Sequence, residues 1–212
     1  MATPKESYYD KRGKLLVKNL QSRHFDAYYC HNREEALEKA LELIPEGASV
    51  GWGGTLTCQQ IGLLDAMRTG PYNALDRDSC QTPEERDQVV RTCLGADYFL
   101  VSANALSMDG HMVTIDGSGN RMAAIVFGPK NVLVIAGMNK VVDTLEDAVH
   151  RARTVAAPMN QQRFGQPNPC TVTGTCANCT CETSICNQIL ITRNCRPAGR
   201  IKFILVGEDL GM

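Results

Sequence analysis

The sequence predicts an α/β domain built around a mostly parallel β-sheet. Short, uniformly apolar runs are typical of buried strands, and the longer segments between them have the apolar spacing of amphipathic helices. Strands and helices alternate along the chain, which is typical of parallel sheets whose crossover connections are helical. The 212 residues contain no visible repeat, low-complexity segment or linker, so we expect one domain over residues 1–212.

The first elements follow from apolar spacing. Residues 5–23 form an amphipathic pattern with Leu15, Leu16, Val17 and Leu20 on its apolar side. DAYYC, residues 26–30, is typical of a short strand. REEALEKALELI, residues 33–44, consists of good helix formers with alanines and leucines at helical spacing.

Glycine and capping signals define the next elements. ASVGWGG, residues 48–54, predicts a strand that runs into a glycine-rich turn. A helix over 55–70 would be capped by Thr55 and ended by the Gly-Pro pair that follows. Residues 82–96 begin with a capping-box pattern and predict another helix.

Buried strands dominate the second half. DYFLVSANAL (97–106) and NVLVIAG (131–137) are typical of buried strands, and two Asp-Gly pairs around HMVTI indicate a hairpin or bent strand. RMAAIVFG predicts a short helix and residues 144–164 a long one with Pro158 near its later turns. Residues 188–193 and 200–211 predict the last strands.

Composition excludes several classes of protein. The net charge is −1 and no basic stripe is present, so we expect no nucleic-acid partner. The longest apolar runs are too short to span a bilayer, and the N-terminus lacks the apolar run of a signal peptide. We therefore expect a cytoplasmic protein whose cysteines stay reduced.

Five of the ten cysteines gather in PCTVTGTCANCTCETSIC, within a long inserted loop at about residues 169–187. Four of them have the spacing C-x5-C-x2-C-x6-C: Cys170, Cys176, Cys179 and Cys186. Thiolates bind both zinc and iron–sulfur clusters, but structural zinc sites usually show two C-x2-C pairs and this segment has one. The pattern favours a [4Fe–4S] cluster, with zinc as the alternative and free thiols as a third reading. Cys181 and Cys195 are further thiols that could substitute for a ligand.

Two glycine-rich loops are candidates for ligand binding. GWGGT, residues 51–55, lies between a strand and a helix, where free backbone N–H groups favour a phosphate or carboxylate. DGSGNR, residues 116–121, offers an open backbone together with Asn120 and Arg121, which could pair with such an anion. Either loop could also be a tight turn required only for packing.

Several motifs together resemble the lactate-utilisation (LUD) domain family. These are VGWGGTLTCQQIGLLDAM, the run from SANALSMDG to AGMNK, AAPMNQQR, the cysteine segment and ILVGEDLG, which together span about residues 10–211. The resemblance implies a three-layer α/β/α sandwich similar to ribose-5-phosphate isomerase, glucosamine-6-phosphate deaminase and CoA transferases. It also implies a link to the oxidation of L-lactate to pyruvate, in which family members work alongside iron–sulfur proteins.

The resemblance carries site residues onto this chain. The positions expected at the ligand site are Gly53, Gly54, Thr55, Asp116, Gly117, Gly119, Asn120, Arg121, Asn139, Lys140, Glu208 and Asp209. Four cysteines are typical of short members, and they correspond to the four named above. Gln60 stands where members commonly carry a glutamate. An amide cannot act as a general base, so Gln60 could only orient a ligand by hydrogen bonds.

Three functions agree with these patterns. The first is a redox component of organic-acid metabolism that binds a small carboxylate or phosphate ligand and passes electrons through the cluster to an iron–sulfur or flavin partner protein. The second is a non-redox enzyme of the isomerase or CoA-transferase type with structural zinc. The third is a non-catalytic metabolite-binding or assembly protein. A homodimer is plausible for this kind of fold, although no periodicity indicates it.

Overall fold

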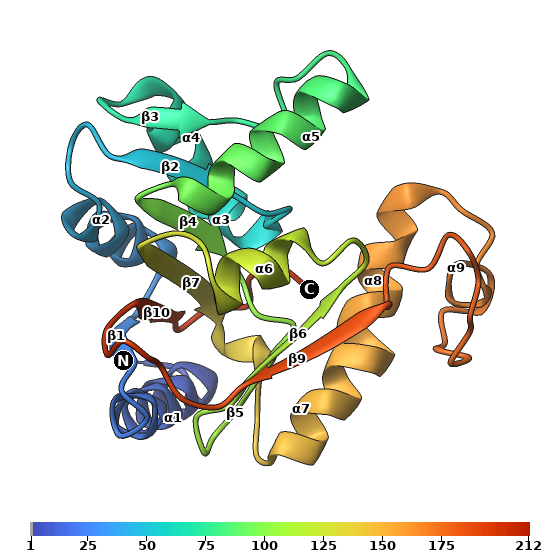
Figure 1. Ribbon diagram of the computed structural model, residues 1–212. Coiled ribbons are helices and arrows are strands. Elements are labelled where there is room, and N and C mark those ends of the chain that lie inside the picture. Colours follow the sequence, from blue (N-terminus) through green and yellow to red (C-terminus); the bar gives the residue numbers. More distant parts are fainter. Residues whose placement is uncertain (1) are drawn as a thin grey trace.

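A computed structural model describes residues 2–212 and contains a six-stranded sheet in which every neighbouring pair of strands is parallel (Figure 1). In spatial order its strands are β1 (Asp26–Cys30), β10 (Ile201–Val206), β7 (Asn131–Gly137), β4 (Tyr98–Val101), β2 (Ser49–Trp52) and β3 (Asn73–Leu75). The central strands are buried on both faces, as their uniformly apolar sequences require. The predicted α/β fold class is confirmed.

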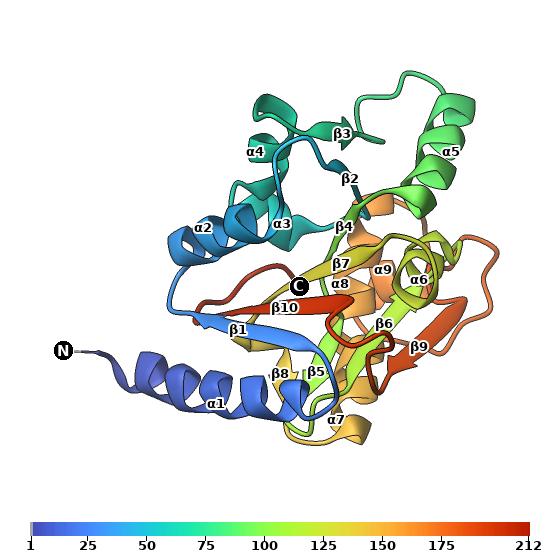
Figure 2. The same ribbon diagram turned by 60° about the vertical axis from the view of Figure 1, so that its left-hand side comes forward.

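Helices cover both faces of this sheet (Figure 2). On one face lie α2 (Arg33–Leu43), α3 (Leu56–Gln60) and α4 (Leu63–Thr69), whose apolar side chains meet Trp52, Leu100 and Ile204. On the other lie α1 (Pro4–Gln21) and α6 (Asn120–Val126). These two cores produce the α/β/α sandwich.

A smaller four-stranded sheet extends this second face. Its order is β8 (Val141–Val142), β5 (Ala105–Ser107), β6 (Met112–Asp116) and β9 (Gln188–Thr192). The predicted hairpin is the antiparallel β5–β6 pair. Small alanines of α7 (Leu145–Arg151) and of the turns that follow pack against Val113 and Ile115.

Three predicted elements are divided in the structure. The helix over 55–70 becomes α3 and α4, because Gly62 adopts a left-handed φ of 77° between them. The strand over 97–106 becomes β4 and β5, which belong to different sheets. The helix over 144–164 contains a π-helical turn at Ala152–Ala156, just before Pro158, whose ring nitrogen cannot donate to the helical ladder.

The remaining differences concern short elements. The predicted helix over 82–96 ends earlier, as α5 (Pro83–Thr92) followed by a 3₁₀ turn. The strands β3 and β8 were not predicted, and the expected cysteine loop begins with a short helix, α9 (Pro169–Thr173). Leu15 was placed on the apolar side of the first helix, but it is exposed while Leu16 and Leu20 are buried.

Candidate ligand-binding site

The site lies where the parallel strands end. Because all six strands of the main sheet run in the same direction, the loops after them gather at one edge, where α/β folds bind ligands. The glycine turn at residues 53–55 follows β2, Arg77 follows β3 and Ser102 follows β4. Lys140 closes the 3₁₀ turn Met138–Lys140 after β7.

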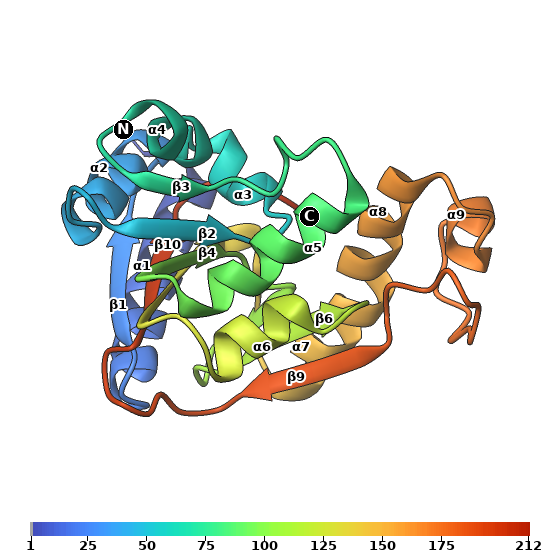
Figure 3. The same cartoon turned by 45° about the horizontal axis from the view of Figure 1, so that its top comes forward.

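A cleft of about 970 Å³ opens beside these loops. Its walls come from α3, α4, α5, α6, the end of α8 (Ala157–Gln161) and the turn after it. Figure 3 shows how these helices are arranged. The charged residues of the lining are Arg68, Arg77, Arg86, Arg91, Arg121 and Arg163, with Asp78, Asp87 and Asp116. A protein with a net charge of −1 therefore carries an excess of positive charge in its main cleft, which attracts anions.

Three of these arginines lie against the glycine turn. A Cβ atom on Gly53 would lie 3.3 Å from Cδ of Arg121. A Cβ on Gly54 would lie 3.6 Å from Arg77 and 4.0 Å from Arg163, in each case from a terminal guanidinium nitrogen. The glycines thus leave space that the arginine side chains occupy.

Arg121 has unused hydrogen-bonding capacity in this cluster. One terminal nitrogen donates to the carbonyl of Ile115, but Nε is fully enclosed and has no partner among the described residues. Burial lowers the pKa of Arg121, although a guanidinium still keeps its charge at neutral pH. A buried donor without a partner is costly, so an acceptor from a bound ligand would stabilise it.

Arg163 is also free of a carboxylate partner. Within residues 2–212, neither Arg121 nor Arg163 forms an ion pair, whereas Arg77 and Arg86 both approach Asp78. The guanidinium of Arg163 donates only to Oδ1 of Asn160, at 3.2 Å. Of the described arginines that line the main cleft, only these two have no ion pair, so they could bind an anion there.

Lys140 lines a second, smaller cavity of about 40 Å³. The two cavities share Gly54, Thr55, Leu56, Arg121, Asn160 and Arg163. Nζ of Lys140 donates to Oγ of Ser102 at 2.8 Å and to Oγ1 of Thr57 at 2.9 Å. Burial lowers the pKa of Lys140 to about 7, and the nearby charges of Arg151 and Arg121 act in the same direction.

The predicted ligand-site residues separate into those of the main cleft, Lys140 of the small cavity, and four that line neither. The main cleft contains Gly53, Gly54, Thr55, Asp116, Gly117, Gly119, Asn120 and Arg121. Asp116 acts mainly on its own loop, since its carboxylate accepts from the backbone N–H groups of Gly117, Arg121 and Met122.

Four predicted residues line neither cavity and have other partners. Oε1 of Gln60 accepts from the N–H of Gly211, and Oδ1 of Asn139 accepts from the N–H of Leu210. Glu208 pairs with Arg33, and Asp209 pairs with Lys5. The structure therefore does not bring these four side chains together with the arginines.

Sequence reasoning missed Arg77, Arg163 and Ser102. Ser102 had a signal, because it directly follows a buried strand and so lies at the carboxyl edge of the sheet. Arg77 follows the unpredicted strand β3, and Arg163 follows the last turn of a helix far along the chain. Their proximity depends on tertiary structure alone.

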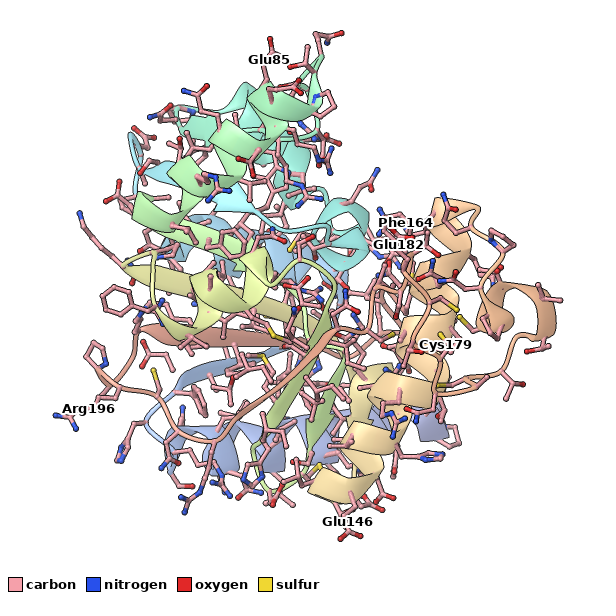
Figure 4. The ribbon with its side chains drawn as sticks, turned by 45° about the vertical axis from the view of Figure 1, so that its right-hand side comes forward. Glu85, Glu146, Phe164, Cys179, Glu182 and Arg196 are labelled. Carbon is pink, nitrogen blue, oxygen red and sulfur yellow. The ribbon has the colours of Figure 1, made fainter. Side chains whose placement is uncertain are left out.

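The cysteine segment lies beside α8, and Figure 4 labels Cys179 within this segment. Burial raises the pKa values of Cys170 and Cys186, and neighbouring thiols raise them further. The thiols that act on Cys170 are those of Cys179 and Cys176. The thiols that act on Cys186 are those of Cys176, Cys170 and Cys179. The four sulfurs thus lie within electrostatic range of one another. Across residues 2–212, however, no three Cys, His, Asp or Glu side chains converge closely enough to hold a single metal ion.

The other thiols differ in position. Cys181 lies beside Cys179, which raises its pKa through a hydrogen bond between the two side chains. Cys195 is buried in the core near Ile201, whose N–H donates to its sulfur. Of the two, only Cys181 lies among the cysteines of the segment.

The cysteine segment also contacts the main cleft. Ile185, next to Cys186, lines the cleft and approaches Gly117, where an added Cβ would lie 3.3 Å from its Cα. Asn187 donates its backbone N–H to the carbonyl of Asp116 and its side-chain amide to the carbonyl of Gly117. The segment and the DGSGNR loop are therefore adjacent.

Comparison with known proteins identifies the family. The model of the LUD domain matches residues 13–206, which is most of the chain. The chain belongs to the LUD domain family. Membership relates the protein to lactate utilisation and confirms the resemblance seen in its motifs.

One solved structure supports the fold, and a second was compared. A DUF162 family protein from Deinococcus radiodurans is similar with a TM-score of 0.53 and 10% sequence identity, covering 95% of this LUD chain and 97% of that chain. Ribose 5-phosphate isomerase A from Methanocaldococcus jannaschii has a TM-score of 0.35 and 12% identity, over 63% of this chain and 66% of that one. No curated protein matches the chain.

None of the helices in residues 2–212 combines the length and apolar character needed to cross a membrane.

Proposed function

We propose that this LUD protein binds a small organic acid, or its phosphorylated form, in the arginine-lined cleft and serves organic-acid utilisation through that site. One observation carries the proposal: Arg121 has an enclosed Nε without a partner, and Arg163, which lines the same cleft, has no ion pair among the described residues. A carboxylate or phosphate oxygen provides the acceptor and the negative charge that this pair lacks.

Titration calorimetry tests the binding proposal with L-lactate, pyruvate and inorganic phosphate as ligands. We expect at least one acid to bind, and Arg163→Gln to weaken that binding about tenfold or more, because a hydrogen bond to a charged group is lost. Lactamide is the neutral control ligand.

Arg196→Gln is the matched control variant. Arg196 is also exposed, but it lies across the molecule from Phe164, which lines the cleft (Figure 4). Absence of heat with all three acids, or equal losses in the two variants, would contradict the proposal.

A second proposal concerns the cysteine segment, whose sulfurs are candidate ligands of a [4Fe–4S] cluster: Cys170, Cys176, Cys179 and Cys186. Four thiolates on one zinc ion would lie about 4 Å apart, whereas a cluster presents four separate irons. The segment has a single C-x2-C pair, whereas structural zinc sites usually have two, and this spacing supports the cluster over the single ion. When bound, a cluster would supply one-electron transfer. It would lie near the acid, because Ile185 lines the cleft and Asn187 hydrogen-bonds the adjacent loop at Gly117.

Anaerobic purification tests the cluster by visible absorption together with iron, acid-labile sulfide and zinc analysis. We expect about four irons and four sulfides per chain, with the colour lost in Cys179→Ala and kept in Cys80→Ala. Cys80 is a half-buried thiol outside the segment.

Other outcomes of this experiment favour other functions. Stoichiometric zinc without colour would overturn the cluster and favour a non-redox enzyme of the isomerase or CoA-transferase type. Acid binding without metal or turnover would favour a metabolite-binding or assembly protein. The iron–sulfur or flavin partner protein, the homodimer and the cytoplasmic location stay predictions.

A further inference from the structure

Lys140 has an unusual environment for a buried lysine. It is 3% exposed, and its Nζ contacts the hydroxyls of Thr57 and Ser102, which are themselves 3.2 Å apart. Within residues 2–212 Lys140 has no carboxylate within ion-pair distance. Buried ammonium groups normally have an acidic partner, so this arrangement favours the neutral amine.

The charges that face Lys140 also favour the neutral amine. Arg151 from α7 and Arg121 from α6 both disfavour a further positive charge, while the thiol of Cys58 from α3 acts in the opposite direction. The thiol of Cys58 is itself held neutral, since burial raises its pKa to about 12. An amine that is largely free near neutral pH has a lone pair available for attack on an electrophilic carbon.

The size of the small cavity limits which chemical group can reach the amine of Lys140. Its volume of about 40 Å³ suits a carbonyl group or a few waters rather than a whole metabolite. Arg121 and Arg163 line both this cavity and the main cleft, so one small molecule could place its carbonyl at Lys140 and its anionic group at the arginines. A ligand with both groups is an oxo acid.

We propose that Lys140 forms an imine with the carbonyl carbon of a small oxo acid whose carboxylate is bound by Arg121 and Arg163. This inference rests on the proposed binding of acids in the cleft and names their chemical class. The Nζ lone pair attacks the carbonyl carbon, the C–N bond forms, and the carbonyl electron pair moves to oxygen. Proton transfer from nitrogen to this oxygen gives a carbinolamine, which loses water as the C=N bond forms. Ser102 and Thr57, at hydrogen-bond distance from Nζ, are placed to relay these protons. No oxidant or reductant is required.

Reductive trapping tests the imine. The full chain is incubated at pH 7.5 with pyruvate and cyanoborohydride, and adducts are located by peptide mass spectrometry. An exposed lysine with a pKa near 10.4 is only about 0.1% free amine at this pH. We expect Lys140 to be labelled at least about tenfold faster than Lys130, even after its burial slows access.

Lys130 is the matched control, because it lies directly before β7 as Lys140 lies shortly after it, but Lys130 is exposed. Lys130→Arg should keep the adduct at Lys140. Lys140→Arg should remove it. Should Lys140→Arg fail to fold, Arg163→Gln gives a second test: it should slow labelling of Lys140 by pyruvate but not by acetone, which lacks a carboxylate.

Labelling of Lys140 no faster than Lys130 would overturn the inference. If calorimetry still detected pyruvate binding, only the imine would fail and the acid-binding function would stand. If neither binding nor an adduct were found, the proposed function would fail as well.

Discussion

At the scale of single residues, the distinction between Arg121 and Lys140 explains how two cations coexist in one site. Arginine keeps its charge under burial, whereas a lysine amine can release its proton. Arg121 can therefore attract the anionic part of a ligand, while Lys140, hydrogen-bonded to two hydroxyls, offers a neutral amine. The charge of Arg121 follows from its residue type, but the neutral amine of Lys140 does not, because it depends on burial.

The environment of Lys140 predicts a pH dependence of stability. Burial lowers its pKa from 10.5 to about 7, so between these values the unfolded chain binds the proton that the folded chain has lost. The free energy of unfolding should then rise with pH, by up to about 1.4 kcal/mol per pH unit from this group. In the wild type, the free energy of unfolding measured in urea should be about 1–2 kcal/mol higher at pH 9 than at pH 7.5. Lys140→Met should lack this increase. Equal gains in the two proteins would show that Lys140 is charged in the folded state.

At the scale of elements, the sequence predicts strands better than it predicts helix breaks. The strands at 26–30 and 131–137 have the predicted boundaries. For 131–137 the reason is burial on both faces, which requires a continuous apolar run. The α3–α4 break was missed since the apolar spacing continues through Gly62 and only the left-handed backbone there interrupts the helix. Three-residue β3 was missed because it is too short to show a period.

Gly62 provides a test of this break. Gly62→Ala should destabilise the protein by about 1–2 kcal/mol, because a Cβ atom disfavours its φ of 77° while its surroundings offer ordinary contact at 3.8 Å. Gly95→Ala is the control, since its backbone is not left-handed and nothing lies within 4 Å of the added atom. That change should be neutral or stabilise by about 0.5 kcal/mol. Chemical denaturation measures both, and a Gly62→Ala protein as stable as the wild type would contradict the backbone account.

At the scale of the whole molecule, the parallel sheet assembles the site from distant segments. Strand ends separated by nearly ninety residues bring Gly53, Ser102 and Lys140 to one edge, while α8 and the cysteine segment close the cleft from the side. The glycine loops were identifiable from sequence because glycine spacing is local. The arginine cluster was not, since Arg77, Arg121 and Arg163 meet only after folding.

The central claim is that Arg121 and Arg163 bind the anionic group of a small acid, and a crystal structure grown with pyruvate tests it most directly. The account predicts a carboxylate oxygen within hydrogen-bond distance of the guanidinium of Arg121, with a second contact from Arg163. Pyruvate bound at another place in the molecule, or an Arg121 Nε that a protein atom satisfies while the cleft holds no acid, would contradict it.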